Sequence, residues 1–426
     1  MRVLWFVEKP LPAVARRQGQ PPIHHAAWLD QYESALRGAP GLTLGIAAPT
    51  QSPYEPFDDA GVTYYGLPSG ESTGYGRVAG RWRRVLRPDV DLGQSQRVVD
   101  MFRPDLMHVH GFEWQYGLLA ARGAAPTVIS IQGILTVYEL MDIRGMGVDL
   151  LLAFSPALLL RGTGTLLDYV SLRRSAGRER QIIQQCRHFI GRTRWDADVV
   201  RVLNPNARYY HCDELLRPEF RASVWDQARC APRTVFCTMG GYARKGLGTL
   251  LKAVAILREG ACPDVRLRVT DVGPGDTEGK KAAARQIRRL GLYDCVTVVG
   301  WLDSSGLARE LLDASVFACP THIDNSSNSL AEALMVGTPC VASAAGGIPT
   351  LARDGVEALL VQDGDPYALA GAILRLFEDK TLAQQLSQGA RAAALRRHDP
   401  ETVRETLLAI YRTVLDDERC HHHAER

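Results

Sequence analysis

Short runs rich in β-branched residues alternate with longer helical patterns along the whole chain. This alternation is typical of βαβ units, which build parallel sheets covered by helices on both faces. Around residues 217–233, two prolines and several charges interrupt the alternation. The sequence therefore predicts an α/β protein with two doubly wound open sheets. The expected strands are 2–7, 42–48, 106–110, 127–131, 188–191, 208–212, 234–238, 266–272, 296–299, 316–318, 339–342 and 358–361.

The chain length suits this division, because 426 residues accommodate two or three domains of roughly 150 residues each. We expect an amino-terminal domain over 1–217, a linker over 218–233, a carboxy-terminal domain over 234–395, and a helix and tail over 396–426. Ligands of open α/β sheets bind beyond the carboxyl ends of the strands. Two such domains that face each other are expected to hold the functional site in a cleft between them.

Composition excludes several classes of protein. Hydrophobic residues make up 46% of the chain and charged residues 23%, which is typical of globular proteins and not of disordered or collagen-like ones. The net charge of +3 is too small for a coat on nucleic acid, so we expect no nucleic-acid partner. The nine cysteines include no CxxC pair, and we expect them to be reduced thiols of a cytoplasmic protein.

Membrane contact is expected to be peripheral at most. The first residues, MRVLWFV, are typical of a strand and not of a signal peptide. The apolar stretch 150–160 contains Pro156 and falls short of the ~20 residues that span a bilayer. Ten arginines and only four acids follow between residues 161 and 208. This basic region fits an anionic membrane, a phosphate-bearing acceptor or a merely solvated helix.

Two other sequence patterns indicate which chemistry is absent. A dinucleotide-binding oxidoreductase needs GxGxxG directly after the first strand, where this chain continues EKPLPAVARRQGQPP. The pattern Asp89–Val90–Asp91 matches a metal-binding DxD, but it follows the basic run RWRRVLRP and not a strand. We therefore expect no metal site there, and we interpret the terminal CHHHAER as a frayed end.

The strongest motif covers residues 321–350, THIDNSSNSLAEALMVGTPCVASAAGGIP. An expected strand leads into a polar loop and then into a helix that begins near Ser327–Ser329. The free N–H groups and the positive dipole at a helix start favour phosphate. Asp324 precedes this helix start, and Glu332 lies eight residues later, where its carboxylate could accept both hydroxyls of a ribose. Because apolar residues surround Glu332, its charge is expected to need a partner.

A second motif covers residues 237–257, CTMGGYARKGLGTLLKAVAIL. It contains a strand, a glycine turn and a helix that opens at Lys245–Gly246. A lysine ammonium at a helix start suits a departing anion, since it supplies a concentrated positive charge.

These motifs resemble those of the GT-B glycosyltransferases of the family-4 type. The family carries E-x7-E followed by GTPVVAS-GG-P, and this chain carries Asp324-x7-Glu332 followed by GTPCVASAAGGIP. The resemblance implies two facing Rossmann-like domains with a cleft between them. It also implies retaining transfer of a sugar from a nucleotide-sugar donor, with a UDP-sugar favoured, and with no metal or other cofactor.

The resemblance further implies roles for residues of the carboxy-terminal domain. Asp324 contacts the donor sugar, Glu332 the ribose, and Lys245 the diphosphate that leaves. Gly240 stands where the family usually has an arginine, so Arg244 or an arginine of the other domain takes that role. The implied donor-binding residues are Gly240, Gly241, Arg244, Asn325, Ser326, Ser327, Asn328, Ser329 and Glu332.

The amino-terminal half carries looser matches. PDLMHVHGFEWQYG resembles the family's strand that ends in HxHG, and TVISIQGIL resembles the end of the next strand. Alternation places His108 and His110 on one face, with His110 closer to the carboxyl end, so His110 is expected to act with Lys245 and Asp324 in catalysis. Residues 188–220 resemble a polysaccharide-building branch of the family, which implies a saccharide or lipid-linked acceptor. The expected acceptor-side residues are Gly111, Gln132, Gly133 and Arg192.

Two other functions remain open from the sequence alone. One is a nucleotide-sugar epimerase on the same architecture. The other is a nucleotide-sugar-binding protein without catalysis, because Asp324 and Gly240 replace residues of the family.

Overall fold

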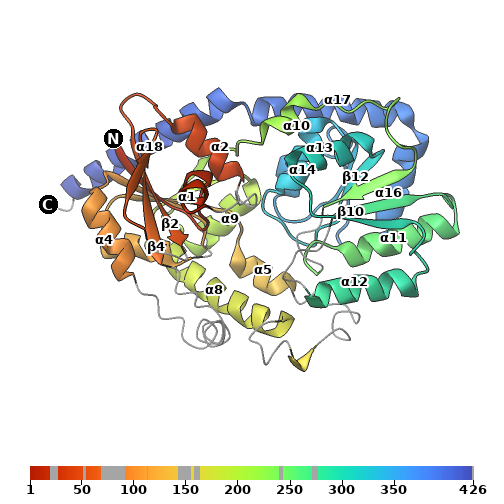
Figure 1. Cartoon of the computed structure of the whole chain (residues 1–426), viewed down its shortest axis with the longest axis horizontal. Coiled ribbons are helices and arrows are strands. Elements are labelled where there is room, and N and C mark those ends of the chain that lie inside the picture. Colours follow the sequence, from red (N-terminus) through yellow and green to blue (C-terminus); the bar gives the residue numbers. More distant parts are fainter. Residues whose placement is uncertain are drawn as a thin grey trace. The chain divides into compact units, whose positions relative to one another are not determined.

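The protein consists of two compact units, each built on one sheet (Figure 1). A computed structural model describes residues 1–19, 27–50, 54–68, 92–112, 114–142, 155–157, 164–238, 243–270 and 277–424. Unit 1 comprises Met1–Thr136, Val170–Leu215 and His398–Arg426, and unit 2 comprises Val137–Tyr169 and Leu216–Arg397. The segment 218–233, expected as a linker, lies in unit 2, and the terminal helix lies in unit 1.

Unit 1 contains an eight-stranded sheet in the order β3-β4-β2-β1-β5-β6-β7-β8. Its strand pairs are parallel except for the pair of β3 and β4. The sequence predicted no strand between residues 48 and 106, so this hairpin was missed. The strands are β1 (Arg2–Phe6), β2 (Thr43–Thr50), β3 (Phe57–Asp59), β4 (Val62–Pro68), β5 (Leu106–His110), β6 (Thr127–Ser130), β7 (His188–Gly191) and β8 (Arg208–His211).

The helices of unit 1 include the last helix of the chain, α18. Tyr411 of α18 is completely buried, and its hydroxyl receives a hydrogen bond from the Trp5 indole at 3.0 Å and lies 2.6 Å from Nδ1 of His108. The last helix therefore completes the core of this unit. The helical segments are α1 (Pro12–Arg17), α2 (Ala27–Leu36), α4 (Gly93–Phe102), the 3-10 segment η2 (Gln115–Arg122), α5 (Leu135–Asp142), which crosses the unit boundary, α8 (Thr165–Gln185), α9 (Arg194–Leu203) and α18 (Pro400–Ala424).

Unit 2 contains a parallel six-stranded sheet in the order β11-β10-β9-β12-β13-β14. Alternate residues of β9 serve two cores: Val235 and Cys237 pack in one, and Phe236 packs in the other. The sheet is therefore doubly wound, as expected. The strands are β9 (Thr234–Cys237), β10 (Arg266–Thr270), β11 (Val296–Gly300), β12 (Val316–Cys319), β13 (Cys340–Ser343) and β14 (Leu359–Val361).

The helices of unit 2 pack into these two cores. Helices α11, α12 and α16 contribute to the first, α10, α13, α14 and α15 contribute to the second, and α17 contributes to both. None of the helices in the described residues of either unit is both long and apolar enough to cross a membrane. The helices are α10 (Pro218–Ala222), α11 (Leu247–Glu259), α12 (Thr277–Arg289), α13 (Ser304–Asp313), α14 (Asn328–Val336), α15 (Ile348–Leu351), α16 (Pro366–Glu378) and α17 (Lys380–Arg397).

In unit 2, the loop before α11 and the loop after β12 are close enough for their backbones to be in contact. The amide of His322, after β12, donates to the carbonyl of Arg244, before α11, at 2.9 Å. Gly246 lies between these loops with φ +73°, and a Cβ there would lie 1.9 Å from the carbonyl oxygen of Pro320. Only glycine allows this contact without displacement of backbone.

Gly246→Ala should therefore destabilise unit 2 by about 1–3 kcal/mol more than Gly364→Ala. Gly364 is the matched control, since its φ is +76° and nothing lies within 4 Å of its Cβ position. Both variants strain the backbone, but only the first forces two loops apart. Denaturant unfolding of the two variants measures the difference, and equal losses would show that the close approach is not required.

Candidate functional site

The carboxyl ends of β9 and β12 mark the point where the sheet of unit 2 changes direction. The two strands are paired, with Val316 beside Val235 and Phe317 beside Phe236. From β9 the chain passes through α11 to β10 on one side, and from β12 it passes through α14 to β13 on the other. Such switch points bind ligands in open α/β sheets. The expected donor-binding residues that the structure describes lie in the loops after these two strands or in the first two turns of α14, while Gly240 and Gly241 fall outside the described residues.

Lys245 and Asp324 form an ion pair at this switch point. The Lys245 ammonium donates to Oδ2 of Asp324 at 2.5 Å, and the two side chains are 25% and 13% exposed. Burial disfavours the charged carboxylate, but Lys245 and, more weakly, Arg244 outweigh burial and hold the pKa of Asp324 below its usual value. The structure therefore brings together two of the residues expected in catalysis and keeps the Asp324 carboxylate charged.

A third loop holds the backbone of Asp324. The amide of Gly347, which follows β13, donates to the carbonyl of Asp324 at 2.9 Å. At Gly346, with φ +57°, a Cβ would lie 2.1 Å from the same carbonyl oxygen. Gly346 of the motif AAGGIP thus has a steric reason to be glycine, since it lets this loop approach the backbone of Asp324.

Helix α14 begins at this site without a side-chain cap. Its N-cap residue, Ser327, makes no capping hydrogen bond, and its first turn contains no acid. By contrast, Asp303 caps α13 and Asp365 caps α16. Among the described residues, therefore, no side chain neutralises the positive end of α14. Ser326, Asn328 and Ser329, which the sequence assigned to the donor, surround this end and are partly exposed.

Glu332, on α14, is 8% exposed and is paired with Arg217. The Arg217 guanidinium donates to Oε1 of Glu332 from Nη2 at 2.6 Å and from Nε at 3.2 Å. The charged partner that burial was expected to require is thus Arg217 of the protein itself, and the ribose contact of Glu332 stays a prediction. Sequence reasoning missed Arg217 because it lies 115 residues away, at the end of the segment expected as the amino-terminal domain.

Sequence reasoning also missed Tyr138, on α5. Its hydroxyl accepts a hydrogen bond from the amide of Asn325 at 3.2 Å, and Asn325 is completely buried. The Arg244 guanidinium lies 4.3 Å above the Tyr138 ring. Tyr138 therefore contacts two of the expected donor-binding residues, and no motif around it indicates this position.

In unit 1, His110 ends β5 and is 4% exposed. Its ring packs against His108, with 3.8 Å between ring centroids, and against Trp5 and Trp28 at 4.7 and 5.6 Å. Neither ring nitrogen of His110 has a hydrogen-bond partner among the described residues. Burial, aided by His108, holds the pKa of His110 well below its usual value, so the imidazole is neutral.

His108 lies on the same face of the sheet, as alternation predicted, but its two nitrogens are occupied. Nδ1 lies 2.6 Å from the Tyr411 hydroxyl, and Nε2 lies 2.7 Å from the Ser130 hydroxyl. His108 thus serves the core, whereas His110 retains two polar atoms for a ligand.

Two of the residues expected on the acceptor side, Arg192 and Gln132, are bound to each other. The Arg192 guanidinium pairs with Glu214 and donates to Oε1 of Gln132 at 3.2 Å. Arg192 and Glu214 are almost completely buried. Gly133 is buried, and Gly111 has φ +95° with its amide bonded to the Ser130 carbonyl. A small cavity beside them is lined by Trp28, Tyr32, Ser130, Ile131, Gln132, Ile190, Arg192, Cys212 and Glu214.

Comparison with known proteins identifies the segment that holds the switch-point site. The sequence profile described as "Glycosyl transferases group 1" matches residues 232–379. The carboxy-terminal segment belongs to this family. The chain is also similar to a phosphatidyl-myo-inositol mannosyltransferase of Mycobacterium leprae, 34% identical over 172 residues, which are 40% of this chain and 44% of that protein. The amylovoran biosynthesis glycosyltransferase AmsK of Erwinia amylovora is 33% identical over 156 residues, 35% of this chain and 37% of that protein. The chain thus spans less than half the length of these relatives.

Solved structures resemble the whole chain, beyond the group 1 segment. A sucrose-phosphate synthase from Thermosynechococcus elongatus aligns with a TM-score of 0.70 at 17% identity, covering 98% of this chain and all of that one. HepE of Anabaena, in complex with UDP and glucose, aligns with a TM-score of 0.65 at 17% identity, covering 97% of this chain and all of that one. These likenesses confirm the predicted GT-B fold with its two Rossmann-like units.

Asp324→Asn should lower stability in a pH-dependent way in the absence of ligand. Because the folded-state pKa is depressed, the stabilisation is fully present above the unfolded-state pKa near 4 and is lost as the pH falls through the folded-state value. We expect a loss of about 1–3 kcal/mol at pH 7 that shrinks below about pH 4. Urea unfolding between pH 3 and 8 measures it.

Asp264→Asn provides the control, because Asp264 pairs with Arg233 on the surface, where water screens the interaction. A pH-independent loss in Asp324→Asn, or an equal loss in the control, would contradict the assignment of the ion pair.

Proposed function

We propose that the protein is a retaining, metal-independent glycosyltransferase that moves a sugar from a nucleotide-sugar donor, with UDP as the favoured nucleotide, to a hydroxyl of a saccharide or lipid-linked glycan. The observation that carries this proposal is the switch-point site. A lysine, its carboxylate partner and an uncapped helix end lie together there, in a segment of the group 1 family.

The site supplies what departure of a diphosphate needs. In this proposal the donor phosphates lie at the uncapped end of α14, within reach of Lys245. The bond from the anomeric carbon to the diphosphate oxygen breaks while the acceptor hydroxyl attacks from the same face, and the acceptor proton leaves with the diphosphate. Negative charge grows on the diphosphate, so a fixed cation and helix dipole stabilise the transition state more than the ground state. No step requires a metal ion.

Asp324 has two tasks in the proposal. Before the donor binds, it holds the Lys245 ammonium at 2.5 Å and thus keeps the cation in place. With the donor bound, its oxygens accept from hydroxyls of the sugar. Asn325 and Arg244 contact the donor as well, and these contacts replace those that Tyr138 makes with the same two residues.

His110 is proposed to contact a substrate hydroxyl from unit 1. A neutral imidazole with two unoccupied nitrogens can donate one hydrogen bond and accept another, which suits a sugar hydroxyl. Gly111, Gln132, Gly133 and Arg192 are proposed to shape the acceptor side, with Arg192 acting through its contacts to Gln132 and Glu214.

The proposed setting is the cytoplasm, with peripheral contact at the inner face of the cell membrane and a role in surface polysaccharide synthesis. All nine cysteines are free thiols in the structure, which suits a reducing compartment. Similarity to a phosphatidyl-myo-inositol mannosyltransferase and to an amylovoran biosynthesis glycosyltransferase supports a lipid-linked or polysaccharide acceptor.

Incubation with UDP-glucose and other nucleotide sugars tests the proposal. We expect release of the nucleoside diphosphate only when a glycan acceptor is present, and NMR should show the donor's anomeric configuration in the product. An isomerised donor without acceptor would favour an epimerase. Donor binding without any turnover would favour a binding protein.

Lys245→Ala should lower single-turnover transfer by about 10²–10³-fold at saturating substrates, because it removes a cation from the departing diphosphate. Lys245→Arg should recover only part of the rate, since its planar fork cannot replace a compact ammonium. Lys252→Ala, on the exposed side of α11, is the control and should be unchanged. A Lys245→Ala enzyme with full rate and weakened donor affinity would contradict the leaving-group role.

Glu332→Gln should weaken donor binding by about 1.5–3 kcal/mol in calorimetry, because an amide accepts ribose hydroxyls more weakly than a carboxylate does. Glu310→Gln is the matched control, since Glu310 is also a helical carboxylate paired with an arginine, Arg268, but lies outside the site. The control separates loss of an ion pair from loss of a ligand contact. Equal donor affinity in both variants and the wild type would sink the ribose assignment.

A further inference from the structure

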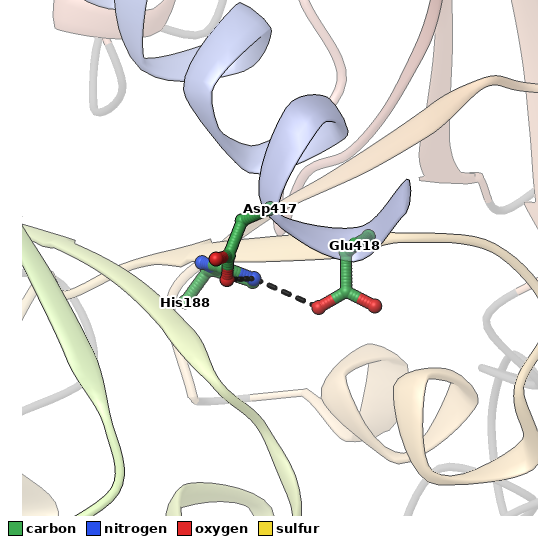
Figure 2. A group of neighbouring side chains, drawn as sticks. All are labelled: His188, Asp417 and Glu418. Atoms are coloured by element: carbon green, nitrogen blue, oxygen red, sulfur yellow. Dashed lines mark hydrogen bonds and ion pairs between the residues drawn. The ribbon is translucent and has the colours of Figure 1, made fainter. Parts of the chain in front are cut away.

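Unit 1 contains a second cluster of chemically active side chains, formed by His188, Asp417 and Glu418 (Figure 2). His188 is the first residue of β7 and is 1% exposed, and the two acids belong to α18. His110, by contrast, is the last residue of β5. Since β5, β6 and β7 run parallel, His188 lies at the amino ends of these strands and His110 lies at their carboxyl ends. The cluster is therefore separate from the proposed reaction.

The three ligand-type atoms have the spacing of a metal site. Nε2 of His188 lies 2.8 Å from Oε1 of Glu418 and 3.5 Å from Oδ2 of Asp417, and all three atoms lie within 4.8 Å of one another. Ligands about 2.0–2.1 Å from a tetrahedral zinc ion lie roughly 3.4 Å apart. A small increase in the distance between Nε2 of His188 and Oε1 of Glu418 would make room for the ion.

Neighbouring side chains contact the other polar atoms of His188 and Asp417. The Tyr210 hydroxyl lies 3.1 Å from Nδ1 of His188, so it can accept the Nδ1 proton and leave Nε2 with its lone pair. Arg208 lies 2.8 Å from Oδ1 of Asp417, while Oδ2 is buried without a hydrogen bond. Partners of this kind orient ligands in zinc sites.

Positive charges beside the three side chains lower the affinity of the cluster for a metal cation. Arg208 and Arg187, whose Nε lies 3.4 Å from Oδ2 of Asp417, offset part of the carboxylate charge. A cation must therefore bind against two guanidinium groups, and we expect micromolar rather than nanomolar affinity, on the order of 10⁻⁶ M.

We propose that His188, Asp417 and Glu418 bind one Zn²⁺ ion, with water in the fourth position, and that the ion fastens α18 to β7. One imidazole and two carboxylates suit zinc, which accepts nitrogen and oxygen ligands and tolerates tetrahedral geometry. The role is structural, since the cluster lies away from the proposed substrates.

The experiment uses the full chain with the tail substituted, Cys420→Ser and His421→Ala, His422→Ala, His423→Ala, because this tail could bind zinc by itself. After EDTA treatment and its removal, calorimetry with Zn²⁺ should give one site per chain. At a zinc concentration a hundredfold above the Kd, the thermal unfolding midpoint should rise by about 5 °C.

Three variants in that background locate the ion. Glu418→Gln should lower zinc affinity by more than tenfold, and Tyr210→Phe, which removes an orienting partner, by about tenfold. Asp416→Asn is the matched control and should not change it, because Asp416 is the preceding acid of α18 and its side chain is 74% exposed.

Two results would overturn the proposal. One is the absence of stoichiometric zinc binding in the tail-substituted protein, and the other is unchanged affinity in Glu418→Gln. Either would make the cluster a hydrogen-bonded contact only. Glycosyl transfer in EDTA, below the unfolding temperature, is a separate readout: it should persist, and its loss would contradict the metal-independent reaction without bearing on where zinc binds.

Discussion

The proposed donor site depends on two places where one backbone presses directly on another. Gly246 faces the carbonyl of Pro320, and Gly346 faces the carbonyl of Asp324, each with no room for a Cβ. These contacts lock the loops after β9, β12 and β13 into one rigid edge of the sheet. This steric fit acts together with the ion pair between Lys245 and Asp324 to position the lysine, the carboxylate and the helix end. The positions of these charges therefore depend on two residues, Gly246 and Gly346, that have no Cβ.

Opposite charges in both units are satisfied within the protein before any ligand arrives. Lys245 pairs with Asp324, Arg217 with Glu332, and Arg192 with Glu214. Buried ions without partners would cost several kcal/mol each, so such pairs are expected wherever charged groups wait for a substrate. Under the proposed function, a donor that binds at Lys245, Asp324 and Glu332 would exchange these partners for its own hydroxyls and phosphates. The proposed donor affinity would therefore be a difference between two sets of strong contacts. His110 is an exception among the described residues, because both of its nitrogens lack a partner.

Short-range patterns in the sequence predicted most of the fold and part of the candidate site. All twelve expected strands form, because β-branched runs and alternation act over a few residues, and the positions of Lys245, Asp324 and Glu332 followed from motifs of fixed spacing. The hairpin of β3 and β4 was missed because Val62–Pro68 contains glycine and proline and resembles a loop. Arg217 and Tyr138 were missed for another reason. Each meets its partner across more than a hundred residues of chain, and nothing in its immediate sequence specifies that encounter.

The burial of Tyr411 has a consequence for biosynthesis. Unit 2 is almost continuous in the chain, over residues 216–397, whereas unit 1 needs residues from both ends. As the chain leaves the ribosome, the first strands appear long before the helix that supplies a hydroxyl to Trp5 and His108. The amino-terminal sheet must therefore persist with an unfinished core while the second unit is made and folds. Premature termination anywhere before residue 411 leaves that core open, so shortened chains expose apolar surface that quality-control proteases recognise.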